Sequence, residues 1–515
     1  MNIRDAKKEI IHSVKAYLAK DGHGQYLIPR LRQRPILLMG PPGIGKTQIM
    51  EQAARECGIG LVSYTITHHT RQSAVGLPFI KEKLFDGSSF QVTEYTMSEI
   101  ICSIYQYMED TGCREGILFI DEINCVSETL APTMLQFLQY KTFGNQAVPE
   151  GWIIVTAGNP PEYNRSVHDF DYVTLDRVRR MDIEADLDAF KSYAREAHLH
   201  PFILSYLELR PQNFYRTERD VDGIQFVTAR GWEDLSTLIR TYEDLSLPVS
   251  RSLIRQFLQH DDIALDAAAY YDLYCKYQKE YDIRLILQGR APTDIHQRLF
   301  SASFDEKLSC VELLVSGLGS YASDALTQEQ IVEEAFSFLK SFRSRLEDLS
   351  AGRSVGTVHP DSLYPDMLTS RRSAFKNREK TGLITPEEKK VEARLLTLLA
   401  GWTPEHFSSG EEAFAQVKDH FNEEKEVLEE KVHLTSKALG HAFLFMEEAF
   451  GEGQEMVIFV TELTLDPRLS GFISEYGCDK YFSYHKRLLI GSRRTKILNE
   501  LNRDKIYENV LEYDF

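Results

Sequence analysis

The stretch PILLMGPPGIGKT, residues 35–47, sets the architecture of the first half of the chain. Residues 35–39 are apolar without alternation, which is typical of a strand buried on both faces of a parallel sheet. Residues 40–43, Gly-Pro-Pro-Gly, cannot continue a strand or begin a regular helix. Residues 48–57 are good helix formers and end before Gly58, a predicted C-terminal cap. The sequence therefore predicts a strand, a glycine-rich loop and a helix.

This layout is the context in which a phosphate-binding loop, or Walker A motif, is expected. The loop consists of Gly40, Pro41, Pro42, Gly43, Ile44, Gly45, Lys46 and Thr47. Its glycines let backbone N–H groups close around phosphate oxygens, and the next helix points its positive dipole end at the same anion. Lys46 adds a positive charge near the β and γ phosphates, and Thr47 is a predicted Mg²⁺ ligand. We expect a nucleoside triphosphate with Mg²⁺; the motif leaves ATP and GTP open.

Bulk composition excludes several classes of protein. The chain has 515 residues, of which 43% are hydrophobic and 26% charged, as in soluble globular proteins of several domains. A net charge of -18 argues against a protein that binds mainly through nucleic-acid phosphates. The seven cysteines contain no C-x-x-C pair, which favours reduced thiols over a disulfide framework. No apolar stretch is long enough for a membrane span, and the N-terminus lacks a signal-peptide core, so we expect a cytoplasmic protein.

Strand and helix patterns alternate up to about residue 185, and helical patterns dominate afterwards. The predicted strands are 35–39, 60–67, 116–120, 152–157 and 180–184, and the clearest helices between them are 99–110 and 130–140. This alternation predicts an α/β fold with a parallel sheet. Residues 75–96 and 140–152 indicate a hairpin and a loop inserted into this core. Beyond residue 246 we expect helices, including a long exposed helix over 411–433, and one short strand at 456–461.

These patterns divide the chain into six segments. They are an N-terminal helix (1–29), an α/β nucleotide-binding core (30–185), a helical lid (186–245), a helical region (246–349), a linker (350–366) and a mostly α-helical C-terminal domain (367–515).

Two further strand ends carry polar side chains suited to nucleotide hydrolysis. In GILFIDEIN, residues 116–124, an apolar strand delivers Asp121 and Glu122 at its carboxyl end, where open α/β sheets bind ligands. Asp121 is suited to hold Mg²⁺ or its water, and Glu122 to polarise the attacking water. The strand WIIVTAGNP, residues 152–160, ends in Asn159, whose amide is suited to orient that water. The pairing of loop and carboxylates indicates hydrolysis.

Together, GPPGIGKT, LFIDEIN, the TAGNP strand end, LDRVRR and TARGWEDL resemble an AAA+ ATPase of the MoxR-like group. The resemblance covers about residues 30–245. It implies a P-loop AAA+ core with a parallel sheet and a small helical lid, ATP and Mg²⁺ as cofactors, and assembly into a ring, commonly a hexamer. It also implies that the two insertions project toward the axial face of the ring, and that the client is a protein, often one with a von Willebrand factor A domain.

The resemblance also assigns roles to individual residues. It implies Asn159 as the first sensor and Arg177 as the arginine finger that reaches a neighbour's γ-phosphate, with Arg179 and Arg180 as close rivals. Arg230 is implied as the second sensor, on the lid. The family usually has a proline before this arginine, whereas this chain has Ala229.

Two other classes of function stay open. A nucleic-acid motor or nuclease partner is one, because residues 371–380 contain five basic side chains, although an exposed helix face is the simpler interpretation. A nucleotide-responsive scaffold with little turnover is the other, and the intact pair Asp121 and Glu122 argues against it. We do not expect nucleic acid to be a partner.

Overall fold

The structure is a computed structural model that describes residues 1–68, 74, 76–85, 88–127, 129–143, 146–163, 170, 172–220, 223–292, 294–350 and 360–487. Its contacts divide the chain into two units. The first contains Met1–Phe190, Phe214–Asp234 and Thr369–Lys390. The second contains Lys191–Asn213, Leu235–Leu368 and the described part of the chain from Val391 onward.

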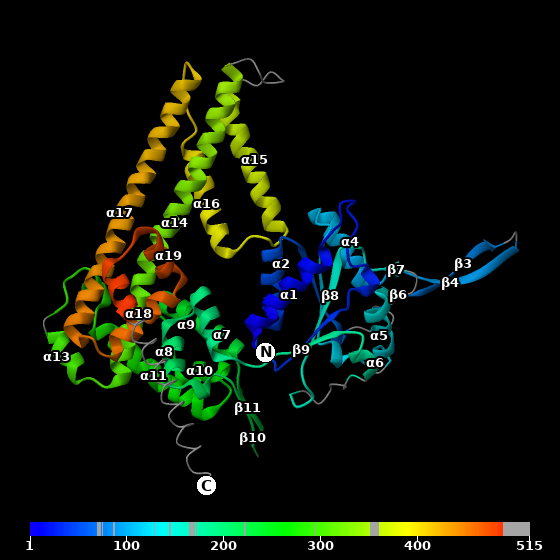
Figure 1. The fold of residues 1–515 in the computed structure, drawn as a ribbon, viewed down its shortest axis with the longest axis horizontal. Helices are drawn as coiled ribbons and strands as arrows, with labels where there is room; N and C mark the ends of the chain where they lie inside the picture. Colours follow the sequence, from blue (N-terminus) through cyan, green and yellow to red (C-terminus); the bar gives the residue numbers. More distant parts are fainter. Residues whose placement is uncertain are drawn as a thin grey trace, which may run out of the picture. The chain divides into compact units, whose positions relative to one another are not determined.

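A five-stranded parallel sheet forms the centre of the first unit (Figure 1). Its strands are β1 (Ile36–Met39), β2 (Gly60–Thr65), β5 (Gly116–Asp121), β8 (Trp152–Gly158) and β9 (Arg179–Asp182), in the order β2-β5-β8-β1-β9. All five correspond to strands predicted from the sequence. Every residue of β1 and β8 is buried, as expected for strands covered on both faces.

Helices cover both faces of this sheet because successive side chains of a strand point to opposite sides. Ile36 and Leu38 belong to a core with α1 (Ile3–Leu18) and α2 (Lys46–Cys57). Leu37 and Met39 belong to a second core with α4 (Glu99–Thr111) and α5 (Ala131–Tyr140). The helix α2 ends at Gly58 with φ 65°, the left-handed cap that the sequence predicts. The α/β fold with a parallel sheet is confirmed.

The described residues also form three two-stranded hairpins. The predicted hairpin at 75–96 is confirmed as β3 (Pro78–Phe85) and β4 (Ser88–Tyr95), and its turn, 86–87, lies outside the described residues. The loop at 140–152 contains the short pair β6 (Thr142–Phe143) and β7 (Gln146–Ala147). The third hairpin, β10 (Arg216–Asp220) and β11 (Gly223–Val227), interrupts the region 186–245 that the sequence predicts to be a helical lid. Its first strand is polar, so no apolar alternation indicated it.

The remaining elements are helical. Short ones in the first unit are η1 (Arg30–Arg32), η2 (Ile66–His68), η3 (Ile123–Cys125) and α6 (Tyr172–Leu175). Later along the chain come α7 (Leu187–Glu196), α8 (Pro201–Leu209), η4 (Pro211–Asn213), α9 (Ala229–Asp244), α10 (Arg251–Phe257), α11 (Asp261–Glu280), α12 (Ile283–Leu287) and α13 (Asp294–Ser301). The last are α14 (Phe304–Ser350), α15 (Pro360–Lys380), α16 (Pro386–Gly401), α17 (Gly410–Phe450), α18 (Gln454–Leu465) and α19 (Pro467–Tyr476). Of the predicted linker, residues 351–359 lie outside the described part of the chain, as do residues 488–515.

The predicted strand at 456–461 is wrong, because these residues lie inside α18. The run MVIFVT is rich in strand formers, but tertiary packing overrides this local preference. Met456, Phe459, Val460 and Leu463 are buried at spacings of three and four residues, which is the apolar stripe of a helix.

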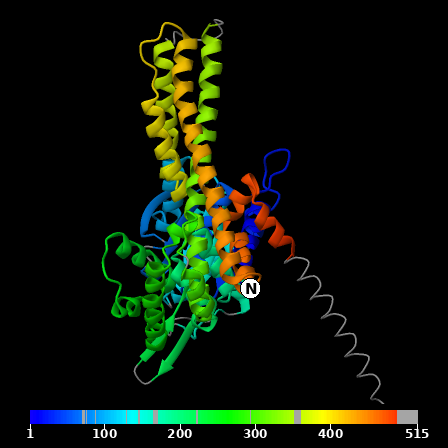
Figure 2. The ribbon, with the colours of Figure 1, turned by 90° about the vertical axis from the view of Figure 1, so that its left-hand side faces the viewer.

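The long helices α14 and α17 pack side by side within the second unit (Figures 1 and 2). Their seam contains Phe336 against Phe421, with ring centroids 6.1 Å apart. Glu424 breaks the apolar repeat of α17, and the buried amide of Gln328 in α14 donates a 2.6 Å hydrogen bond to its carboxylate. The prediction of a long helix over 411–433 is confirmed.

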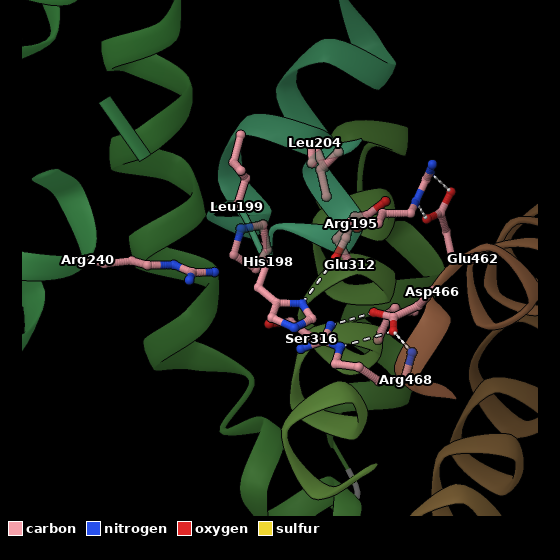
Figure 3. Close-up of a pocket in the computed structure, with 13 residues that line it drawn as sticks. Arg195, His198, Leu199, Leu204, Arg240, Glu312, Ser316, Glu462, Asp466 and Arg468 are labelled. Carbon is pink, nitrogen blue, oxygen red and sulfur yellow. Dashed lines mark hydrogen bonds and ion pairs between the residues drawn. The ribbon is translucent and has the colours of Figure 1, made fainter. Parts of the chain in front are cut away.

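A cluster of charged side chains inside the second unit joins α7 to the C-terminal helices (Figure 3). Arg195 of α7 donates two hydrogen bonds, of 2.9 and 2.7 Å, to the carboxylate of Glu462 in α18. Burial beside Glu462 raises the pKa of the Glu312 carboxyl in α14 well above its usual value. The helix α8 also packs against α11 and α14. The helix α8 and the part of α7 from Lys191 onward, both in the predicted lid, therefore belong to the same unit as the C-terminal helices.

The lysine that follows α5 should make the stability of the first unit depend on pH. Lys141 is 1% exposed, and burial together with the nearby charge of Arg30 lowers its pKa to about 7. In the unfolded chain the pKa of this lysine returns to about 10.4. Between pH 7 and about pH 10.4 the unfolded chain therefore binds more protons than the folded chain, so the stability of the folded chain rises with pH. Lys141→Met should therefore raise stability at pH 7 by on the order of a few kcal/mol, and this gain should shrink toward pH 10. Thermal melts at pH 7 and 9.5 measure it.

Lys8→Met, at an exposed position of α1, is the matched control and should change neither melting temperature. A gain for Lys141→Met that is the same at both pH values would contradict the assignment of a buried, poorly solvated ammonium.

Among the described residues, no helix combines the length and apolar character that crossing a membrane requires.

Candidate functional site

The predicted phosphate-binding loop lies between β1 and α2, as the sequence indicates. Gly43 and Gly45 have φ angles of 71° and 95°, in the left-handed region that favours glycine. A Cβ on Gly43 would also lie 2.8 Å from the hydroxyl oxygen of Thr228. The loop thus depends on glycine for both its backbone conformation and its close approach to the start of α9.

Lys46 is the buried cation of the site, with 8% of its surface exposed. Its ammonium donates hydrogen bonds to the carbonyl oxygens of Gly40 and Pro41, both at 2.8 Å, and to Oδ1 of Asn159 at 2.9 Å. Burial lowers the pKa of Lys46 to about 8; the charge of Arg230 adds to this effect, while Asp121 and Glu122 oppose it. Lys46 and Asn159, which are 113 positions apart in the sequence, are therefore in direct contact.

The predicted metal ligands lie together. Oγ1 of Thr47 donates a 3.1 Å hydrogen bond to Oδ2 of Asp121. The two oxygen atoms therefore lie close enough together at the edge of the sheet to bind one metal ion. Hydroxyl and carboxylate oxygens are the donors that Mg²⁺ prefers. Glu122 has φ 57°, which is uncommon for a residue other than glycine, and its N–H donates to Oδ1 of Asp121 at 2.9 Å. This conformation turns the chain sharply at the acidic pair.

The start of α9 contacts the loop directly. The backbone N–H of Arg230 donates to the carbonyl of Gly43 at 3.0 Å, and the hydroxyl of Tyr215 donates to the carbonyl of Pro42 at 2.9 Å. The amide of Gln48 also donates to both carboxylate oxygens of Glu233, at 3.0 and 2.9 Å. The guanidinium of Arg230 is exposed, yet its charge is close enough to lower the pKa of Lys46.

The three finger candidates differ in their surroundings. Arg179 donates to Glu9 at 2.7 Å and to Ser13 at 2.8 Å, which ties it to α1 of its own chain. Arg180 pairs with Asp182 at 2.8 Å, and both line a cavity of about 870 Å³ beside the loop. Arg177 is exposed, in the turn after α6.

Strand register places Arg177 away from its own phosphate-binding loop. In the parallel pair β1 and β9, Arg179 lies opposite Ile36 and Asp182 opposite Met39. Arg177 therefore precedes the amino-terminal end of β9, whereas the loop follows the carboxyl end of β1. At about 3.3 Å per residue, the length of β1 alone separates these ends by about 13 Å. The structure thus brings Lys46, Thr47, Asp121, Glu122 and Asn159 together, and leaves Arg177 apart.

Comparison with known families agrees with this geometry. Residues 36–173, from β1 into α6, match the family described as ATPase family associated with various cellular activities (AAA). This part of the chain is an AAA ATPase domain. The matched range contains the loop, the acidic pair and Asn159 of the AAA domain, and ends before Arg177 and α9. No curated protein matches the chain.

The residues of the AAA domain fit a nucleoside triphosphate with Mg²⁺, the cofactors that this family generally uses. A glycine cradle, a buried ammonium and a hydroxyl beside a carboxylate supply the three kinds of group that such a ligand requires.

Sequence interpretation missed several contacts of this site. The sequence pattern assigns no role to Asn124, the last residue of LFIDEIN, which is 3% exposed and donates a 2.7 Å hydrogen bond to the backbone carbonyl of Asn159. It also does not predict the contact between Gln48 and Glu233. The position of Asn124, two residues after the acidic pair, was the one available signal for it.

Proposed function

We propose that the chain is a MoxR-like AAA+ ATPase that hydrolyses ATP to remodel a protein partner. The observation that carries this proposal is the convergence of Lys46, Asp121, Glu122 and Asn159 at the carboxyl edge of adjoining strands. A bare nucleotide-binding scaffold needs the cation and the loop, but it has no need for a second carboxylate and an amide beside them.

Each side chain then has one task. The loop and Lys46 bind the β and γ phosphates, and Thr47 and Asp121 hold the magnesium ion, which neutralises charge on the phosphates when it is bound. Glu122 accepts a proton from the attacking water, and Asn159 orients that water. Arg230 contacts the phosphates from the start of α9.

The proposal includes a ring, with six subunits as the expected number, in which Arg177 completes the site of a neighbouring subunit. Two observations support this role. Arg177 precedes the amino-terminal end of β9, away from its own loop, and it is exposed and has no ion pair to a described residue of its own chain, unlike Arg179 and Arg180. An exposed guanidinium at this place is suited to act in trans, where it stabilises charge on the transferred phosphoryl group.

The helix α9 is the route by which nucleotide would act on the rest of the chain. It begins on the loop, through Arg230 and Glu233, and from Leu235 onward it belongs to the second unit. A change at the phosphates would therefore reach the C-terminal helices, which we propose to dock or regulate the client. A von Willebrand factor A domain is the expected client, on the strength of the family resemblance alone.

The alternative, a nucleic-acid motor, has one observation in its favour. Arg372 and Lys376 in α15 are exposed basic residues. Arg378 of the same cluster, however, lies 3.7 Å from Glu388, and the chain as a whole carries a net charge of -18. Stimulation of the ATPase by DNA or RNA that weakens steeply with salt would favour this alternative.

The proposed function is tested by comparing ATP binding and turnover of the full chain with those of Lys46→Ala. Loss of the buried ammonium should weaken ATP binding by about 100-fold or more, because truncating a buried charge partner costs several kcal/mol. Calorimetric titration and a steady-state ATPase assay measure the two quantities.

Lys8→Ala removes an exposed lysine and serves as the control, with binding unchanged. Wild-type affinity in a folded Lys46→Ala variant, or no ATP turnover by the wild-type chain, would overturn the proposal.

A further inference from the structure

A buried amide connects the two segments whose side chains the proposed reaction assigns to the attacking water. Asn124 belongs to η3, which follows Glu122 directly, and its Nδ2 donates to the backbone carbonyl of Asn159 at 2.7 Å. The side chain of Asn159 in turn accepts the 2.9 Å hydrogen bond from Lys46. One residue thus connects the segment that carries Glu122 with the strand end that carries Asn159.

The surrounding backbone makes room for this amide. A Cβ on Gly158, the last residue of β8, would lie 2.6 Å from Oδ1 and 2.9 Å from Cγ of Asn124. A larger residue at position 158 would therefore force the side chain of Asn124 to shift. Asn124 is 3% exposed, and its Oδ1 has no hydrogen-bond partner among the described residues.

The Oδ1 atom without a partner helps to explain why position 124 holds an asparagine. A buried polar atom without a partner costs free energy, so packing alone would favour an apolar side chain of similar size. What an apolar side chain cannot supply is the N–H that donates to Asn159. Asn124 thus supplies the Nδ2 donor to Asn159, while its own Oδ1 has no partner among the described residues.

We infer that Asn124 is a positioning residue for ATP hydrolysis, which holds the backbone of Asn159 in register with Glu122. This inference rests on the proposed function of the site. Asn124 does not touch the phosphates in this role; it acts through Asn159 and through the turn at Glu122. Misplacing a reacting group by about 1 Å can cost about 100-fold in rate, so loss of this clamp should appear in kcat.

The test uses the full chain, ATP with MgCl₂ for turnover and ADP for binding. Asn124→Ala removes the amide, and Asn124→Asp keeps its shape but replaces the N–H donor with a carboxylate oxygen. Both variants should lower kcat by about 10- to 100-fold, while the Kd for ADP stays within about threefold of wild type. Equal kcat in a folded Asn124→Asp variant and the wild type would overturn the inference.

Thr435→Val is the matched control for loss of a buried side-chain hydrogen bond. Thr435 is fully buried in α17, and its hydroxyl lies within hydrogen-bond distance of two carbonyl oxygens, that of Lys431 in the same helix at 2.8 Å and that of Tyr321 in α14 at 3.1 Å. It should lower the melting temperature by an amount similar to Asn124→Ala without changing kcat. A fall in kcat of the same size in Thr435→Val would show that Asn124 acts only through stability.

A double variant separates packing from positioning. Gly158→Ala alone should lower the melting temperature, because its Cβ meets Asn124, and combining it with Asn124→Ala should relieve that clash. The double variant should regain stability relative to Gly158→Ala but keep the low kcat of Asn124→Ala. Recovery of kcat together with stability would contradict a positioning role.

The inference and the proposed function fail in different ways. If the wild-type chain does not hydrolyse ATP, the proposed function itself is wrong. If Glu122→Gln is inactive and Asn124→Asp is fully active, only the role of Asn124 is wrong.

Discussion

Glu122→Gln should bind ATP as tightly as the wild-type chain and hydrolyse it about 10²- to 10⁴-fold more slowly. The substitution keeps the shape of the side chain and removes the group that accepts a proton from the attacking water. The contacts of Lys46 with Gly40, Pro41 and Asn159 do not involve Glu122, so binding should persist. Binding is measured by titration with ATP, and hydrolysis by phosphate release in a single turnover.

Glu426→Gln makes the same chemical change at an exposed position of α17 and should leave both quantities unchanged. Wild-type turnover in Glu122→Gln would mean that another group accepts the proton. The same variant, held in ATP and used for affinity capture, would report the partner and, by mass measurement, the number of subunits.

Arg177→Ala should bind ATP normally and lose about 10³- to 10⁵-fold in hydrolysis rate, the range that an arginine finger contributes. The expected loss is large because the finger neutralises charge that develops on the transferred phosphoryl group. Arg179→Ala should behave differently, since Arg179 pairs with Glu9 and donates to Ser13. Its main effect should be a lower melting temperature. Parallel ATPase assays and thermal melts of the two variants distinguish these outcomes.

Mixing Arg177→Ala with Glu122→Gln tests whether sites are shared between subunits. In a mixed assembly, some junctions pair an intact Glu122 in one subunit with an intact Arg177 from its neighbour, so part of the activity should return. Mixing Arg177→Ala with Lys46→Ala should have the same effect, for the same reason. No recovery, despite co-assembly confirmed by mass, would favour a site completed within one chain.

Much of the core of the AAA domain could be predicted because its signals are local. The run at 35–39 is apolar at every position, and Gly-Pro-Pro-Gly ends it at once, so neither strand nor turn depended on distant residues. The strand at 456–461 failed under the same reasoning, because its residues pack as one face of α18. A short apolar run does not distinguish a strand from a buried helix.

The amino-acid order alone was sufficient to identify the loop, the acidic pair and Asn159, since each follows a recognisable buried strand. Tertiary structure was needed to show that Lys46 bonds Asn159, that Arg179 is bound to its own α1 while Arg177 is exposed, and that Asn124 clamps Asn159. It also showed that α8 of the predicted lid packs with α11 and α14. The physical reason is that these contacts join side chains distant in sequence, and only the folded backbone sets which of them meet.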